Sequence, residues 1–157
     1  MNIKKRLLSF STVGILLYLS ASTIRYSSSM LLWDSFIWFD LNPINLLLIK
    51  NYGALVIYAI ALVLAMQWLR RAIGKEISGR RLFRQALIFY IICFVSQFGI
   101  SMLEGFLYNE TYYDLVDKHV KGLAEQGSMF TLYNDLLLGV LLTIITISVL
   151  FWTIRKD

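Results

Sequence analysis

Long apolar runs without a charged residue recur four times along the chain. They comprise 18, 19, 19 and 19 residues, and charged residues bound each of them: 7–24, 51–69, 85–103 and 136–154. A helix rises about 1.5 Å per residue, so about 20 apolar residues cross the roughly 30 Å hydrocarbon core of a bilayer. The pattern therefore predicts an all-α integral membrane protein with four transmembrane helices in a bundle.

The residues next to these runs adjust the expected ends of the spans. Asn42 and Pro43 are typical of an N-cap followed by proline in the first turn, so the second long helix is expected to begin near Pro43. The first run is longer than the roughly 7–15 apolar residues of a secretory signal, so it is expected to remain as a helix. We divide the single domain 1–157 into spans at about 7–24, 46–69, 85–104 and 135–154, outer loops at 25–45 and 105–134, and a cytoplasmic loop at 70–84.

Charged residues are divided unequally between the two sides of the expected bundle. One side has eleven Lys and Arg residues against two acidic residues, and the other side has four against eight. Six of the basic residues form a cluster in the 70–84 loop: Arg70, Arg71, Lys75, Arg80, Arg81 and Arg84. Because cytoplasmic loops are enriched in Lys and Arg, both termini and this basic cluster are predicted to be cytoplasmic.

The composition supports a membrane protein and changes how the net charge is interpreted. The chain is 58% hydrophobic, whereas soluble domains are about 45–50% apolar. A net charge of +5 would suit nucleic acid, but a nucleic-acid binder spreads its basic residues over a soluble face. Here they flank apolar runs, so the expected partner is the lipid bilayer, with about 1 kcal/mol of attraction to anionic headgroups per basic residue. No nucleic acid is expected.

The first outer loop, 25–45, is rich in aromatic residues and is interrupted by Asp34 and Asp40. Aromatic residues favour the headgroup boundary, so a short helix over 30–41 is expected to lie on the outer leaflet.

The second outer loop, 105–134, has apolar residues on one helical face between Leu115 and Leu123. This spacing predicts a short amphipathic surface helix. His119 is expected to be a solvated residue of that helix.

Small and polar residues recur at three-and-four spacing in each span, as on helix faces that associate in lipid. The simpler interpretation is that these faces meet and close a compact bundle. The alternative is a solute or proton pathway, because polar residues that line a cavity mark such pathways. The candidate polar intramembrane face comprises Gln97, Ser101, Glu104, Asp135, Thr143 and Lys50.

Motifs for catalysis are missing from the sequence. It has no HExxH, no Ser/His/Asp set and no Gly-rich phosphate loop, and it has a single His and a single Cys. We therefore expect no enzymatic activity, no cofactor, no metal and no catalytic residues.

Three segments of the C-terminal half follow a recognisable order. These are the basic turn and third helix "AIGKEISGRRLFRQALIFY", the outer segment "YNETYYDLVDKH" and the basic tail "FWTIRKD". In this order they resemble a family of small four-helix bacterial inner-membrane proteins that is known only as a domain of unknown function. The resemblance covers residues 71–157, and the aromatic outer loop of the first half departs from it. It implies a bacterial inner-membrane location and a four-helix topology, and it transfers no activity.

The expected role is that of a non-enzymatic inner-membrane protein that associates with another membrane protein or with itself as a homo-oligomer. The alternatives are a small channel or carrier formed by a homo-oligomer, and an immunity or toxin-like membrane protein. The Gln97 and Ser101 face discriminates between the first two. Tight packing against the last helix indicates a structural role, and contact with water indicates transport.

Overall fold

The computed structural model describes residues 3–75, 78–125 and 128–155, and in these ranges every regular element is a helix. The helices are α1 (Ile3–Ile37), α2 (Pro43–Gly74), α3 (Gly79–Leu107), α4 (Glu110–Glu125) and α5 (Ser128–Arg155). The predicted all-α class is therefore confirmed.

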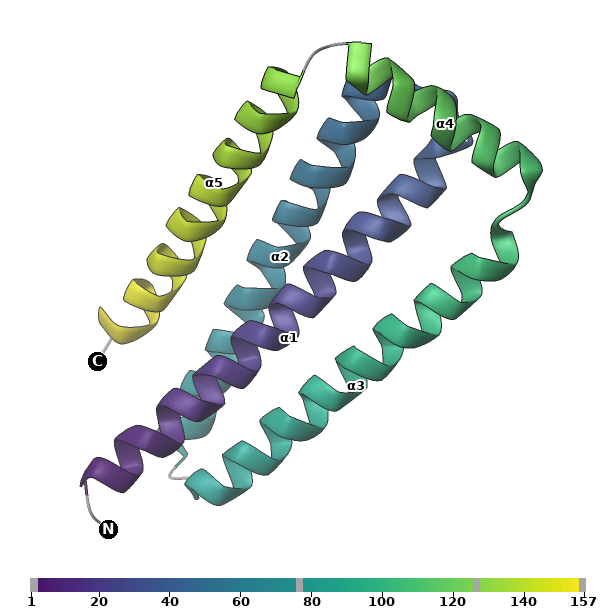
Figure 1. The fold of residues 1–157 in the computed structure, drawn as a ribbon. Helices are drawn as coiled ribbons and strands as arrows, with labels where there is room; N and C mark the ends of the chain where they lie inside the picture. The colour runs from purple at the N-terminus through teal and green to yellow at the C-terminus, as the bar shows by residue number, and fades with distance from the viewer. Residues whose placement is uncertain (1–2, 76–77, 126–127, 156–157) are drawn as a thin grey trace.

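The arrangement of the helices follows from which of them pack together. The long helix α1 lies between α2 and α3, and α5 packs against α2, so α3 and α5 lie on opposite sides of the molecule (Figure 1). The short helix α4 lies across one end, which we call the α4 end. Both chain termini and the connection between α2 and α3 lie at the opposite end, which we call the basic end (Figure 1).

The prediction of four transmembrane helices was wrong. Among the described residues, three helices are long and apolar enough to cross a membrane: Pro43–Gly74, Gly79–Phe106 and Phe130–Trp152. The predicted first span, 7–24, is instead part of the 35-residue helix α1. Frequent hydroxyl residues and Arg25 dilute the apolar character of this helix.

The predicted outer loop 25–45 was also wrong, together with its separate interfacial helix. Residues 25–37 continue α1 without a break, and the connection to α2 is short. Serine and threonine are compatible with this long helix because their hydroxyls donate to its own carbonyls one turn earlier, as Ser20 does to Leu16 (2.8 Å). The chain then reverses at Asp40, whose φ of 47° is a conformation that Asp tolerates better than most residues.

The predicted start of the second long helix is confirmed. The side chain of Asn42 accepts a hydrogen bond from the backbone N–H of Ile44 (2.9 Å), and Pro43 occupies the first helical position. Proline is suited to this position because the first helical N–H groups have no partner within the helix.

Packing between α1 and α2 follows a four-residue spacing on both helices. Val13, Leu17 and Ala21 of α1 are buried against a row of buried residues from Tyr58 to Met66 of α2. Residues four apart lie on the same helical face, so each row forms a ridge that packs into the other helix. A second buried cluster lies at the α4 end, where Ile37 and Leu46 meet residues of α4.

Within the predicted outer loop 105–134, residues 110–125 form the helix α4. The first half of α4 packs against the end of α1 and the start of α2, and its second half also lies close to the start of α2. At this approach a Cβ atom added to Gly122 would lie 2.6 Å from Cγ of Pro43. A glycine is therefore required for α4 to lie this close to α2.

Replacing Gly122 by alanine is expected to destabilise the docking of α4 by about 1–2 kcal/mol, because the rigid proline ring cannot move aside. The control is Gly105→Ala, since a Cβ there meets no atom within 4 Å and alanine favours a helix by about 0.5–1 kcal/mol. Hydrogen exchange of the α4 amides measures both variants. Unchanged exchange in Gly122→Ala would show that the close approach does not hold α4.

Candidate functional site

The most concentrated polar chemistry in the described residues lies at the α4 end, around Asp34. This residue of α1 is 9% exposed. Its carboxylate faces two tyrosines from the junction between α3 and α4. The hydroxyl of Tyr112 donates a hydrogen bond to Oδ1, and the hydroxyl of Tyr108 donates to Oδ2 at 3.5 Å. We call Asp34, Glu104, Tyr108 and Tyr112 the buried acid cluster.

The two tyrosines are placed by the junction between α3 and α4. Tyr108 is the C-cap of α3, directly after its last residue, and Tyr112 lies in the first turn of α4. The side chain of Asn109 fixes this turn by accepting from the backbone N–H of Tyr112 (2.9 Å). The rings of the tyrosines then stack with centroids 4.5 Å apart, so both hydroxyls reach the same carboxylate.

Glu104 of α3 brings a second carboxyl group beside Asp34. Its side chain is 4% exposed, and its Oε1 atom has no hydrogen-bond partner among the described residues. A buried polar atom without a partner loses the hydrogen bonds that water would give it. Glu104 is therefore the least satisfied member of the buried acid cluster.

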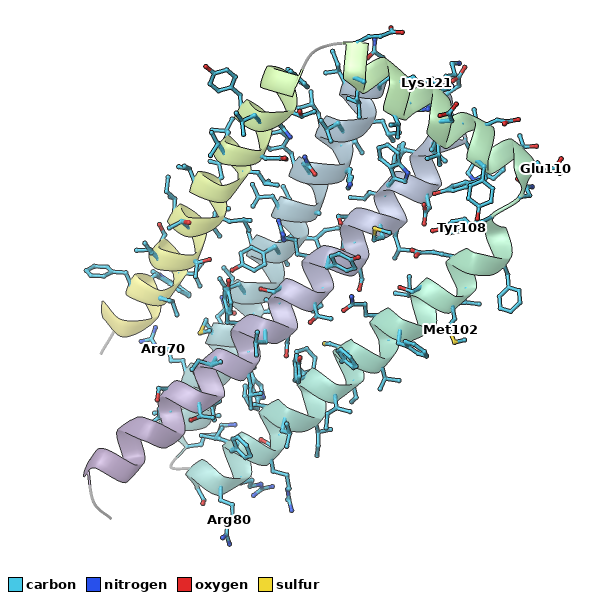
Figure 2. The ribbon with its side chains drawn as sticks, viewed as in Figure 1. Arg70, Arg80, Met102, Tyr108, Glu110 and Lys121 are labelled. Carbon is cyan, nitrogen blue, oxygen red and sulfur yellow. The ribbon has the colours of Figure 1, made fainter. Side chains whose placement is uncertain are left out.

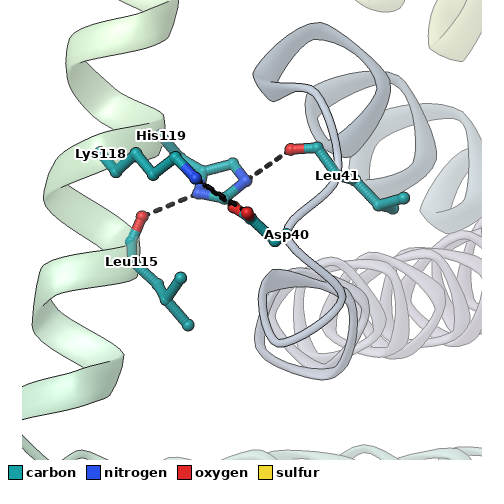
Figure 3. Close-up of polar contacts among 5 residues, drawn as sticks. All are labelled: Asp40, Leu41, Leu115, Lys118 and His119. Atoms are coloured by element: carbon teal, nitrogen blue, oxygen red, sulfur yellow. Dashed lines mark hydrogen bonds and ion pairs between the residues drawn. The ribbon is translucent and has the colours of Figure 1, made fainter.

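His119 connects α4 to the segment between α1 and α2, and the prediction that it is solvated was wrong. It is 1% exposed. Its Nε2 lies 2.8 Å from the carbonyl oxygen of Leu41, and its Nδ1 lies 2.7 Å from that of Leu115 (Figure 3). The ring also meets Trp33 edge-on. Of the apolar residues assigned to the inner face of α4, Val120 is exposed, and His119 takes a buried position on that face instead.

An exposed ion pair lies beside this histidine. Nζ of Lys118 is 2.6 Å and 2.8 Å from the two carboxylate oxygens of Asp40 (Figure 3). The hydrogen bond and the charge of Lys118 hold the pKa of Asp40 below its usual value. Both side chains are more than half exposed, so the pair contributes little to stability.

The contacts of α4 with the end of α1 and the following segment share one register. Asp34 with Tyr112, Asp40 with Lys118, and Leu41 with His119 are each separated by 78 residues in the sequence. The constant separation means that the contacts follow one another in the same order along both segments, as α4 crosses from the end of α1 to the start of α2. The buried acid cluster is thus one end of a continuous seam that attaches α4 to the bundle.

The structure does not bring the predicted polar intramembrane face together. Gln97 and Ser101 lie on α3, whereas Asp135 and Thr143 lie on α5, on the other side of α1 and α2 (Figure 1). Ser101, Asp135 and Thr143 are exposed and Gln97 is half-buried. The Gln97 face therefore does not pack against the last helix, which was the arrangement expected for a compact bundle.

The two remaining members of that face lie near the buried acid cluster. Glu104 belongs to the cluster itself. Lys50 is directed toward Trp33 instead of a carboxylate, and its Nζ lies 5.2 Å from the centre of the ring. Lys50 and Asp34 both line a cavity of about 230 Å³ whose other walls are mainly aromatic.

The predicted basic cluster is found at the basic end of the molecule. Arg70 and Arg71 belong to the last turns of α2, and Arg80, Arg81 and Arg84 to the start of α3. Lys75 is at the C-cap of α2. Figure 2 labels Arg70 and Arg80 at this end, far from Tyr108 and Glu110 at the α4 end.

Asp34, Tyr108, Tyr112 and His119 were not singled out in the sequence as site residues. One signal for the tyrosines was available, since Tyr108 and Tyr112 are four residues apart and flank the acidic segment. Asp34 stood out as an acid inside an aromatic run, but nothing local showed which residue would meet it.

The chemistry of the cluster is that of buried phenols and carboxyl groups. Burial, and then the hydrogen bond to Asp34, raise the pKa of Tyr112 far above its usual value near 10. Burial and the charge of Asp34 also raise the pKa of Tyr108. Among the described residues, no group of three or more His, Cys, Asp or Glu side chains is placed to hold a metal ion.

The raised pKa of Tyr112 predicts that the docking of α4 weakens in alkali. Tyr112 ionises near pH 10 when α4 is detached, but only at much higher pH when it is docked. Its stabilising effect is therefore complete below pH 10 and declines as the pH rises above it. Hydrogen exchange of α4 between pH 8 and 11, corrected for intrinsic rates, is expected to lose protection above pH 10. Tyr112→Phe should remove most of this dependence, and an unchanged profile in that variant would contradict the assignment.

Replacing Glu104 by glutamine is expected to stabilise the protein by about 1 kcal/mol. The amide supplies N–H donors to the Asp34 carboxylate and removes a second acidic group from its side. Asp135→Asn is the matched control, because Asp135 is exposed and its replacement should change little. Thermal unfolding in detergent compares the two variants. If Glu104→Gln lowered the unfolding temperature, the carboxyl group of Glu104 would have its hydrogen bonds satisfied in the wild-type protein.

No family model, curated protein or solved structure matches this chain. The similarity of residues 71–157 to the small inner-membrane family therefore stays a prediction.

Proposed function

We propose that this chain is a non-enzymatic protein of the bacterial inner membrane whose role is to associate with another membrane protein or with a second copy of itself. The observation that supports this most directly is how little of α3 and α5 is covered. In their most apolar stretches, 6% of the residues of α3 and none of those of α5 are buried inside the chain. α3 packs mainly along α1 and α5 mainly along α2, and both helices present most of their remaining faces outward.

Two glycines on these open faces support association instead of exposure to lipid alone. Gly99 of α3 and Gly139 of α5 are both exposed, and a Cβ at either position would meet no atom of the chain within 4 Å. Glycine weakens a helix and is not needed for packing within this chain. In membranes small residues let a second helix approach closely, so an external helix explains both positions.

The orientation that we propose places the basic end in the cytoplasm. The basic cluster lies at the same end as both chain termini (Figure 1), and Lys and Arg are enriched on the cytoplasmic side of inner-membrane proteins. The acidic residues of α4 then lie at the outer surface, with the buried acid cluster just inside it.

Native mass spectrometry of the protein, extracted gently from its own membranes, tests the proposal. A complex with a second polypeptide, or a multiple of the 18.2 kDa chain mass, is expected. Gly139→Leu and Gly99→Leu should reduce the amount of complex, whereas Gly14→Leu, also without atoms within 4 Å but on α1, should not. A monomer that carries lipid only would contradict the proposal.

A small channel or carrier formed by a homo-oligomer is the second candidate. The observation that favours it is the buried carboxyl pair of Asp34 and Glu104, with one oxygen of Glu104 unpartnered, because intramembrane carboxyl groups mark ion and proton pathways. Proton flux into liposomes tests it. Flux that is lost in Glu104→Gln but kept in Asp135→Asn would favour the carrier over the association protein.

A further inference from the structure

An apolar groove lies between α1, α2 and α3. It measures about 610 Å³, within the range of about 300–1,000 Å³ that holds small ligands in proteins. Alanines make its inner surface, and larger residues such as Leu64 and Phe89 border it. The alanines are Ala21, Ala61, Ala65 and Ala86.

The groove lies along the apolar part of the helices and approaches the basic end. Its last lining residues in that direction are Trp68 on α2 and Gln85 on α3. Gln85 is a polar residue at the boundary between the apolar groove and the charged connection. The groove thus has an apolar body and a polar end.

Two arginines extend the walls of the groove by one helical turn. Arg71 follows Trp68 by three residues, and Arg81 precedes Gln85 by four, so each lies on the same face of its helix as a lining residue. Both side chains are exposed. A helical turn is about 5.4 Å long, so the two arginines stand on their helices about one turn beyond the polar end of the groove.

We propose that this groove binds an anionic phospholipid, with an acyl chain along the alanines and the phosphate between Arg71 and Arg81. The occupant is a lipid because two walls of the groove, α2 and α3, are long and apolar enough to cross a membrane, and an anionic one because of the charge at the polar end. Guanidinium groups hold phosphate through paired, charge-assisted hydrogen bonds. A zwitterionic lipid fills the groove equally well but gains less from the two arginines.

Native mass spectrometry with equal amounts of phosphatidylglycerol and phosphatidylethanolamine tests the proposal on the full chain. The wild-type protein is expected to retain phosphatidylglycerol at least fivefold over phosphatidylethanolamine. Arg71→Gln with Arg81→Gln should bring this ratio close to one. The matched control is Lys75→Gln with Arg80→Gln, which removes the same charge from exposed residues of the same cluster and should keep most of the preference.

A second pair of variants tests the groove itself. Ala61→Phe with Ala65→Phe fills it and should reduce the retained lipid severalfold, whereas Val140→Phe adds an aromatic ring to an exposed position of α5 and should not. Gel filtration verifies that each variant is folded, and if the filled variant is not, the arginine variants decide alone. Equal retention of both lipids by the wild type would overturn the proposal. So would full retention in the filled variant, or an equal loss of preference in both charge variants.

Discussion

Replacing Tyr112 by phenylalanine is expected to destabilise the docking of α4 by about 3 kcal/mol. The change removes a single hydroxyl, but this hydroxyl is the close hydrogen-bond donor to Oδ1 of Asp34. Asp34 is nearly buried and has Glu104 beside it. The loss therefore exceeds that of an ordinary hydrogen bond, because it leaves a buried carboxylate without its main donor.

Hydrogen exchange of the α4 amides measures this effect locally, and about 3 kcal/mol corresponds to an increase of about a hundredfold in exchange rate. Tyr113→Phe is the matched control, since the same hydroxyl is removed one residue later from a ring that is 58% exposed. Tyr113→Phe should change the exchange rate of the α4 amides less than threefold. Asp34→Leu tests the pairing further, because Tyr112→Phe should cost little once the carboxylate is gone. Equal effects of Tyr112→Phe and Tyr113→Phe would refute the role of the buried acid cluster.

Replacing Tyr58 by alanine is expected to destabilise the attachment of α5 by about 3 kcal/mol. Tyr58 of α2 is 2% exposed and lies in the main apolar core. Its hydroxyl is 2.7 Å from Oγ1 of Thr146 on α5, and Thr146 in turn donates to the carbonyl of Leu142. Lipid chains are as apolar as the core, so the cost arises from lost packing and a lost hydrogen bond, and not from contact with water.

Two further substitutions separate these contributions. Tyr58→Phe removes only the hydrogen bond, which in membranes is worth about 0.6–1.7 kcal/mol. Val56→Ala is the control, because it also shortens a side chain of α2 but at a position that is 59% exposed. This substitution should leave α5 attached. Thermal unfolding in detergent and cross-linking of α2 to α5 report the result. An attachment of α5 that survives Tyr58→Ala would show that other contacts hold this helix.

The parts of the fold that could be predicted from sequence are those with a strong local pattern. The charge-free runs in α2, α3 and α5 locate the three apolar helices, and Asn42 with Pro43 locates the start of α2. Helix α1 was misinterpreted because Arg25 and the serines around it were taken to end a span. Their polar groups are instead accommodated along one unbroken helix, as the backbone hydrogen bonds of Ser20 and Ser28 show.

The candidate site could not be predicted because its contacts join distant parts of the chain. Asp34 and Tyr112 are 78 residues apart, and nothing in either local segment indicates the other. The sequence also favoured a face shared by the third and fourth spans, but α3 and α5 lie on opposite sides of the bundle. Periodicity shows which residues share a face of one helix, and it does not show which helices become neighbours.

We propose that the basic end and the α4 end lie on opposite sides of a bilayer, with the basic end in the cytoplasm. Single cysteines at two exposed positions test it in a Cys93→Ala background: Ser78→Cys between α2 and α3, and Thr111→Cys in α4. Spheroplasts are treated with a membrane-impermeant maleimide. We expect labelling of Thr111→Cys in intact spheroplasts, and of Ser78→Cys only after the membrane is disrupted. Labelling of Ser78→Cys in intact spheroplasts would contradict it.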